Sequence, residues 1–246
     1  MKILICIDDT DNIESIGTGQ LLEEMCMELE KRGLAKAGFV TRHQLYIHED
    51  IDYTSHNSSM CCEADAEDIE KAVSAAAEYL EEHAAEGSDP GLCILKEDAG
   101  EEDADAFFGE LMRFGRRAQE EILTKEEAYE AASAYPGTVY LSEHGGTGEG
   151  VIGALAGAGL RLTGSDGRIK GKIKPENGPV KLTVEELCRK YPVDRIVSED
   201  GEILPDDTVL YFAEASKAVY MDRLVTLVAV KKDGVWMPRP HKGNKK

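Results

Sequence analysis

The chain opens with an apolar run that ends abruptly in acids. Met1–Ile7 is almost entirely apolar, and Asp8, Asp9 and Asp11 follow it at once. A short apolar run that stops at turn-forming residues predicts a buried strand. The carboxylates therefore stand at the carboxyl end of a strand, where ligands bind in open α/β sheets.

Helical and strand-like patterns alternate after this strand. Apolar residues fall on one face of a predicted helix that starts near Thr18 and ends at Gly33. Further strand-like segments are 37–48, 91–98 and 138–142, and helix-like ones are 64–87 and a region that runs to about residue 134. This alternation predicts an α/β fold with a mixed sheet covered by helices.

The pattern changes near residue 167. A segment rich in glycine, proline and lysine, 167–179, is typical of a loop or domain boundary. One short helix, 183–191, and several short strands follow it. We therefore expect an α/β domain over 1–175, a small α+β appendage with a β-rich character over 176–238, and a flexible tail over 239–246.

Charge narrows the range of partners. The sequence has 48 acids and 28 bases, so its net charge is −20 and the average surface repels phosphate backbones and anionic lipids. No apolar run reaches the roughly 18 residues of a membrane span. We expect a cytoplasmic protein with no membrane partner. Its six cysteines lack a C-x-x-C pair and are expected to be free thiols.

The acidic cluster is the first candidate site. A turn after the strand brings Asp9 and Asp11 together, and carboxylates at such a place suit Mg²⁺, which also takes water and phosphate oxygens as ligands. The alternative is that Asp8 and Asp11 only cap turns or the following helix.

Two glycine-rich segments are candidate phosphate sites. Gly17 and Gly19 flank Thr18 at the start of the first predicted helix, where backbone donors and the helix dipole favour a phosphate, although threonine is also a common N-cap. Gly148, Gly150 and Gly153 match G-x-G-x-x-G after a strand. The absence of the G-K-[ST] lysine excludes a P-loop. A mononucleotide phosphate loop is the favoured interpretation, and a dinucleotide site or close helix packing are the alternatives.

These motifs, in this order, resemble the ATP-using catalytic core of the archaeal tRNA-isoleucine agmatinylcytidine synthetase family. The resemblance lies in "CIDDTDN" with "GTGQL", in Arg42 with "YTSHN", and in "GTGEGVIGALAGAG", and it extends from Met1 to about Gly159. The chain resembles a short form of this core that lacks the family's RNA-binding modules. The resemblance implies that the first domain binds ATP and Mg²⁺.

Residue roles follow from the resemblance. It implies that Asp8, Asp9, Asp11 and Thr18 are catalytic, with Asp9 and Asp11 as metal ligands. The implied nucleotide-site residues are Gly17, Gly19, Arg42, Thr54, Asn57, Gly146, Gly148 and Gly150.

The expected function is that of a Mg²⁺-dependent ATP-binding enzyme, either an ATP-dependent ligase or a kinase-like transferase. It would transfer a phosphoryl or nucleotidyl group to a small acceptor, and the acidic charge makes tRNA an unfavourable partner. A non-catalytic nucleotide-binding or regulatory protein is the alternative. An NAD-dependent oxidoreductase is a third.

Overall fold

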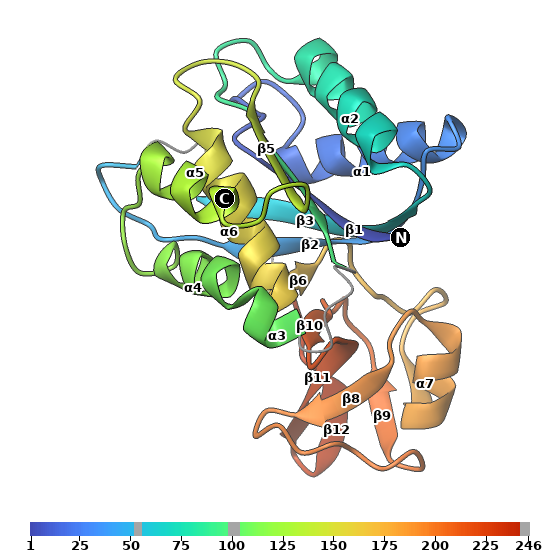
Figure 1. Ribbon diagram of the computed structural model, residues 1–246. Helices are drawn as coiled ribbons and strands as arrows, with labels where there is room; N and C mark the ends of the chain where they lie inside the picture. Colours follow the sequence, from blue (N-terminus) through green and yellow to red (C-terminus); the bar gives the residue numbers. More distant parts are fainter. Residues whose placement is uncertain (52–55, 98–103, 242–246) are drawn as a thin grey trace. The chain divides into compact units, whose positions relative to one another are not determined.

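The computed structural model describes residues 1–51, 56–97 and 104–241, and the chain forms two compact units, Met1–Thr163 and Gly164–Lys246 (Figure 1). Helices and strands alternate in the first unit and strands dominate the second, which confirms the expected α/β class with a small β-rich C-terminal region. The expected domain limits stay a prediction, because compactness does not show which segment folds alone. Among the helices of these residues, none is long and apolar enough to cross a membrane.

The N-terminal unit is an antiparallel sheet covered by helices. Its strands are β1 (Lys2–Asp8), β2 (Ala35–Gln44), β3 (Ser58–Ala66), β4 (Gly91–Lys96) and β5 (Val139–Glu143). Its helices are α1 (Thr18–Lys31), α2 (Ile69–His83), α3 (Ala104–Phe107), α4 (Gly109–Arg117), α5 (Lys125–Ser133) and α6 (Gly150–Leu162). The strand order is β5-β4-β1-β3-β2, and each neighbouring pair is antiparallel. The central strand β1 is therefore hydrogen-bonded on both sides.

Strand β3 departs from the expected pattern. Residues 64–66 were expected to begin a long helix, but they end this strand, and α2 starts only after Asp68, whose side chain accepts a hydrogen bond of 3.2 Å from the amide of Lys71. The strand is rich in serine, cysteine and acids, which have little intrinsic preference for β structure. Pairing with both β1 and β2 imposes the strand conformation.

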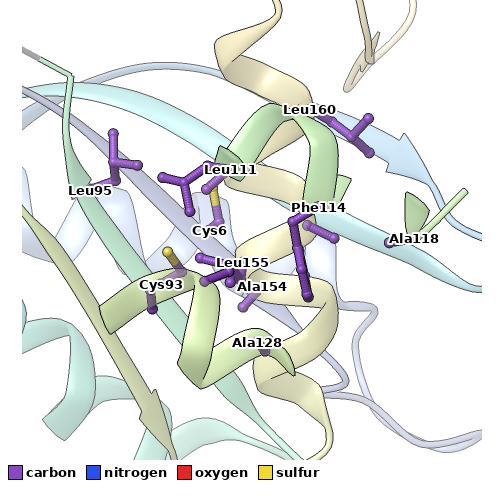
Figure 2. Close-up of a cluster of buried hydrophobic side chains, with 14 of the residues drawn as sticks. Cys6, Cys93, Leu95, Leu111, Phe114, Ala118, Ala128, Ala154, Leu155 and Leu160 are labelled. Carbon is purple, nitrogen blue, oxygen red and sulfur yellow. The ribbon is translucent and has the colours of Figure 1, made fainter. Parts of the chain in front are cut away.

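Each face of this sheet has its own core. The α1 and α2 side chains pack on one face, where Leu21, Leu22, Met25 and Leu29 of α1 are buried at the predicted helical spacing. Helices α4, α5 and α6 cover the opposite face (Figure 1). Figure 2 shows α4 and α6 side chains gathered over β1 and β4 in this second core.

Glycines allow α6 to approach both the sheet and α4. A Cβ atom on Gly157 would collide with the Ser59 side chain on β3, and one on Gly159 would collide with the carbonyl of Leu111 on α4. A Cβ atom on Gly115 of α4 would lie 2.8 Å from backbone atoms of Ala156 and Leu160 in α6. Close packing of the glycine- and alanine-rich helix, one of the two alternatives for this segment, is thus a property of α6.

The prediction of free cysteines was wrong for two of the six. Cys6 on β1 and Cys61 on β3 face each other directly across the strand pair and form a disulfide. Their separation of 55 residues offers no local signal, since only the strand register brings them together. The other cysteines are free, namely Cys26, Cys62, Cys93 and Cys188.

As far as residue 241, the C-terminal unit is a small β structure with one helix. Its elements are β6 (Arg168–Ile169), β7 (Val180–Thr183), α7 (Val184–Lys190), β8 (Arg195–Ser198), β9 (Val209–Phe212), β10 (Val219–Met221), β11 (Leu224–Lys232) and β12 (Val235–Pro238). The strands follow the order β6-β10-β11-β12-β9-β7, and β8 pairs in parallel with β11. Thr183 and Glu186 form a capping box at the start of α7.

Charge is divided unequally between the two units. The N-terminal unit holds 35 of the 48 acids and 12 of the 28 bases, which leaves 13 acids and 16 bases in the C-terminal unit. The argument that average charge disfavours polyanions therefore applies to the N-terminal unit alone.

Candidate functional site

The end of β1 meets the first half of α6. A Cβ atom on Gly153 would collide with the carboxyl group of Asp8, and one on Gly150 would lie 3.2 Å from the carbonyl oxygen of Asp8. The predicted strand-end acid and the predicted glycine motif, which are about 140 residues apart in the sequence, are thus neighbours. Only glycine leaves room for the Asp8 carboxyl against this helix.

Asp8 has a strongly perturbed ionisation. Burial raises the pKa of Asp8 to about 7, and the nearby charge of Asp9 contributes to this rise in pKa. A carboxyl group in such a place holds a proton near neutral pH unless a cation compensates its charge.

The raised pKa predicts how stability depends on pH. Folded Asp8 keeps its proton up to about pH 7, whereas in the unfolded chain it loses it near pH 4. The protonated Asp8 therefore contributes to the free energy of unfolding. This contribution is fully present below pH 4 and is lost as pH rises from 4 to 7, and the total loss is at most about 4 kcal/mol. In urea unfolding with chelator present, Asp8→Asn should flatten the loss of stability between about pH 4.5 and 7.5.

Asp65→Asn is the matched control, because Asp65 is exposed and lies opposite Lys2 at the other end of β1. It should keep the wild-type pH profile. An Asp8→Asn profile parallel to the wild type would show that Asp8 ionises normally.

Asp9 and Asp11 line the turn that connects β1 to α1. Asp9 has a φ of 50°, a left-handed conformation that aspartate tolerates better than most residues. Asp11 accepts a 2.8 Å hydrogen bond from the hydroxyl of Thr18, the first residue of α1. The N-cap is Gly17, without a side-chain cap, so the alternative in which Thr18 caps the helix is wrong.

The second glycine segment forms a loop between β5 and α6. Gly145, Gly146 and Gly148 have positive φ values, of 156°, 54° and 80°, which explains the need for glycine at these positions. Among the described residues, the amides of these three glycines have no hydrogen-bond partner. These donors, with the N-terminal turn of α6, are of the kind that bind phosphate oxygens.

The loop is held by residues that the sequence patterns did not single out. Asp89, in the turn before β4, accepts 2.5 Å hydrogen bonds from both the amide and the hydroxyl of Thr147. The ammonium group of Lys125, on α5, donates to the carbonyl oxygen of Thr147 at 2.8 Å and to Glu143 at 3.2 Å. Three polar groups of Thr147 are thereby occupied.

The other predicted site residues have varied surroundings. Arg42 on β2 donates hydrogen bonds to the Ser58 hydroxyl at 3.0 Å and to the Gln44 side chain at 3.1 Å. The Asn57 side-chain amide donates to the carbonyl of Tyr46 at 2.7 Å, which is a structural role for that group. Gly19 is buried in α1, and Thr54 lies outside the described residues.

The donor set is compatible with a magnesium ion brought by a nucleotide. Within the described ranges no group of three or more histidine, cysteine or acidic side chains is arranged to hold a metal alone. Mg²⁺ needs only one or two carboxylates when phosphates and water complete its shell. The hydroxyl of Thr10, between Asp9 and Asp11, is buried with no hydrogen-bond partner among the described residues. This hydroxyl is therefore available to hydrogen-bond a ligand at the acidic motif.

The fold and the site together define a class: an α/β protein in which acids at or after the end of a buried strand contact the first halves of two helices, one of which follows a glycine-rich loop. Similar solved structures are those of TiaS. Apo TiaS, the agmatidine synthetase of an isoleucine tRNA, is 23% identical over 79% of this chain and 41% of its own, with a TM-score of 0.54.

Two TiaS complexes give similar values. The complex with the isoleucine tRNA and ATP is 24% identical over 79% of this chain and 42% of its own, with a TM-score of 0.55. The complex with the isoleucine tRNA, AMPCPP and agmatine is 21% identical over 86% of this chain and 52% of its own, with a TM-score of 0.54. No protein-family model and no curated protein matches the chain.

The resemblance indicated by the motifs is therefore confirmed in the fold, and this chain spans about half or less of the TiaS chains it matches. At these identities the likeness establishes the arrangement of the backbone. It assigns no activity to the chain, because unrelated activities occur on one fold.

Proposed function

We propose that this protein is a Mg²⁺-dependent, ATP-using enzyme that transfers a phosphoryl or nucleotidyl group to a small acceptor. The observation that carries the proposal is the meeting of Asp8, at the end of β1, with the first half of α6, while Asp11 is hydrogen-bonded to Thr18 at the start of α1. Acids and phosphate-binding donors at one place suit a metal–nucleotide complex better than either component alone.

The roles of the residues follow from their chemistry. Asp9 and Asp11 would hold Mg²⁺, which when bound withdraws charge from the phosphate oxygens of ATP. Thr18, with the amides of Gly146, Gly148 and Gly150, would orient the phosphates. Positioning and charge compensation of this kind supply most of the catalysis in phosphoryl transfer.

The acceptor is proposed from the relatives and from charge. One TiaS complex contains both AMPCPP and agmatine, and a small amine is therefore the first acceptor to test. A cationic amine would also be attracted to the acid-rich N-terminal unit.

Thermal-shift titration with ATP, GTP and NAD, each with and without Mg²⁺, tests the proposal. ATP with Mg²⁺ at about 100 times its Kd should raise the Tm by roughly 5 to 10 °C, since a ligand that binds only the folded state stabilises it by mass action. Asp9→Asn should abolish the rise, because asparagine tolerates the positive φ of this position but lacks the charge.

The other outcomes separate the alternatives. A larger rise with NAD than with ATP would favour the oxidoreductase. ATP binding without product formation across amine, hydroxyl and carboxyl acceptors would favour a nucleotide-binding regulatory protein. A Tm unchanged by every nucleotide would contradict all three functions.

A further inference from the structure

The carboxylate of Asp89 occupies an unusual place for a negative charge. It sits on the glycine loop, and both of its oxygens accept hydrogen bonds of 2.5 Å, from the amide and the hydroxyl of Thr147. A Cβ atom on Gly146 would collide with this carboxylate, and one on Gly150 would collide with the carbonyl oxygen of Asp89. The glycine loop therefore packs closely against the segment that carries Asp89.

The neighbouring backbone extends this contact. The amide of His144 donates a 2.8 Å hydrogen bond to the carbonyl of Pro90, and a Cβ on Gly145 would press on the ring of Pro90. The two segments 88–91 and 144–150 thus pack against each other. Asp89 donates no bond itself, but its carboxylate accepts the side-chain hydrogen bonds that join the two segments. Loss of those bonds frees the amide and the hydroxyl of Thr147 and leaves its carbonyl bonded to Lys125.

The negative charge of Asp89 is not balanced by an ion pair, unlike that of the neighbouring Glu143. Glu143 is paired with Lys125 at 3.2 Å and also accepts a hydrogen bond from Tyr129. No ion pair to Asp89 occurs among the described residues. A phosphate on this loop meets an uncompensated carboxylate, which repels it unless a divalent cation accompanies it.

We propose that Asp89 is a positioning residue that fixes the glycine loop and makes the site select Mg²⁺-bound ATP over free ATP. This inference rests on the proposed nucleotide site. Two substitutions separate the two roles, because alanine removes the bonds and the charge, whereas asparagine removes the charge and keeps an acceptor for the Thr147 amide.

Hydrogen exchange of the loop amides tests the first role without any nucleotide. In Asp89→Ala, the amides of His144 and Thr147, which donate hydrogen bonds to Pro90 and Asp89 in the wild type, should exchange roughly 10- to 100-fold faster, the expected effect of losing hydrogen bonds to a charged acceptor. Asp89→Asn and the exposed control Asp65→Asn should exchange close to the wild-type rate. Unchanged exchange in Asp89→Ala would overturn the positioning role.

The ratio of ATP affinities with and without Mg²⁺ tests the second role. Asp89→Asn should tighten the binding of free ATP by about three- to tenfold and leave Mg²⁺-ATP less affected, so the ratio falls. Asp65→Asn should keep the wild-type ratio, and an unchanged ratio in Asp89→Asn would overturn the selectivity. If the wild type binds no ATP, the proposed function and the selectivity both fail, while the exchange result still decides whether Asp89 holds the loop.

Discussion

Replacement of Gly91 by alanine should destabilise the protein strongly, because the added methyl group has no space. Gly91 begins β4, and a Cβ atom there would overlap the backbone of Gly150 and Val151, where α6 starts. Backbone atoms of a helix and a central sheet cannot move aside as a flexible side chain can. We expect a loss of roughly 3 kcal/mol or more in the free energy of unfolding, which lowers the Tm by roughly 6 to 12 °C.

Gly109→Ala is the matched control for this experiment. Gly109 begins α4, a Cβ atom there would have no neighbouring atom within 4 Å, and its φ is not positive. Its replacement should leave the Tm unchanged or raise it slightly, because alanine favours the helix. Equal Tm values for Gly91→Ala and the wild type in calorimetry would show that β4 and α6 are not in close contact.

Asp11→Asn should reduce Mg²⁺-ATP turnover by roughly 100-fold or more while the Tm stays within a few degrees of the wild type. Asparagine still accepts the hydrogen bond from Thr18, so the turn keeps its 2.8 Å contact and only the charge is lost. The measurement is steady-state ATP consumption with whichever of the amine, hydroxyl and carboxyl acceptors reacts fastest. The reduction should affect kcat more than the KM for the acceptor.

Asp65→Asn removes the same charge from an exposed position on β3, opposite the far end of β1, and should leave turnover unchanged. If Asp11→Asn turns over ATP as fast as the wild type, the Asp11 carboxylate has no role in the proposed reaction. A large fall in the Tm would instead assign Asp11 a structural role, and the thermal melt of the same sample distinguishes the two.

Sequence patterns correctly predicted those elements whose conformation depends on residues close to them in the sequence. The apolar run of β1, the helical spacing of Leu21 to Leu29 and the glycines of the 145–150 loop are readable because each depends on the residues around it. They place Asp8 at a strand end and the loop before a helix. The meeting of these two parts followed from the resemblance to a known family, and the packing of Gly153 on Asp8 now gives it a physical basis.

The features that were missed depend on contacts across the sequence. Asp89 and Thr147 are 58 residues apart, and neither lies in a motif that points to the other. Strand β3 has polar and small residues, and its conformation is imposed by its two neighbours. The Cys6–Cys61 bond depends on the same register.

The central position of β1 has a consequence for biosynthesis. Its partners β3 and β4 are translated after it and are completed only at Ala66 and Lys96, and the helix that packs on Asp8 extends past Gly153. At about 5 to 20 residues per second, roughly 8 to 30 s pass before that helix has been synthesised. During this interval the apolar strand lacks the two strands that pair with it and the helix that packs on Asp8. A segment that is made early is therefore among the last to reach its final surroundings.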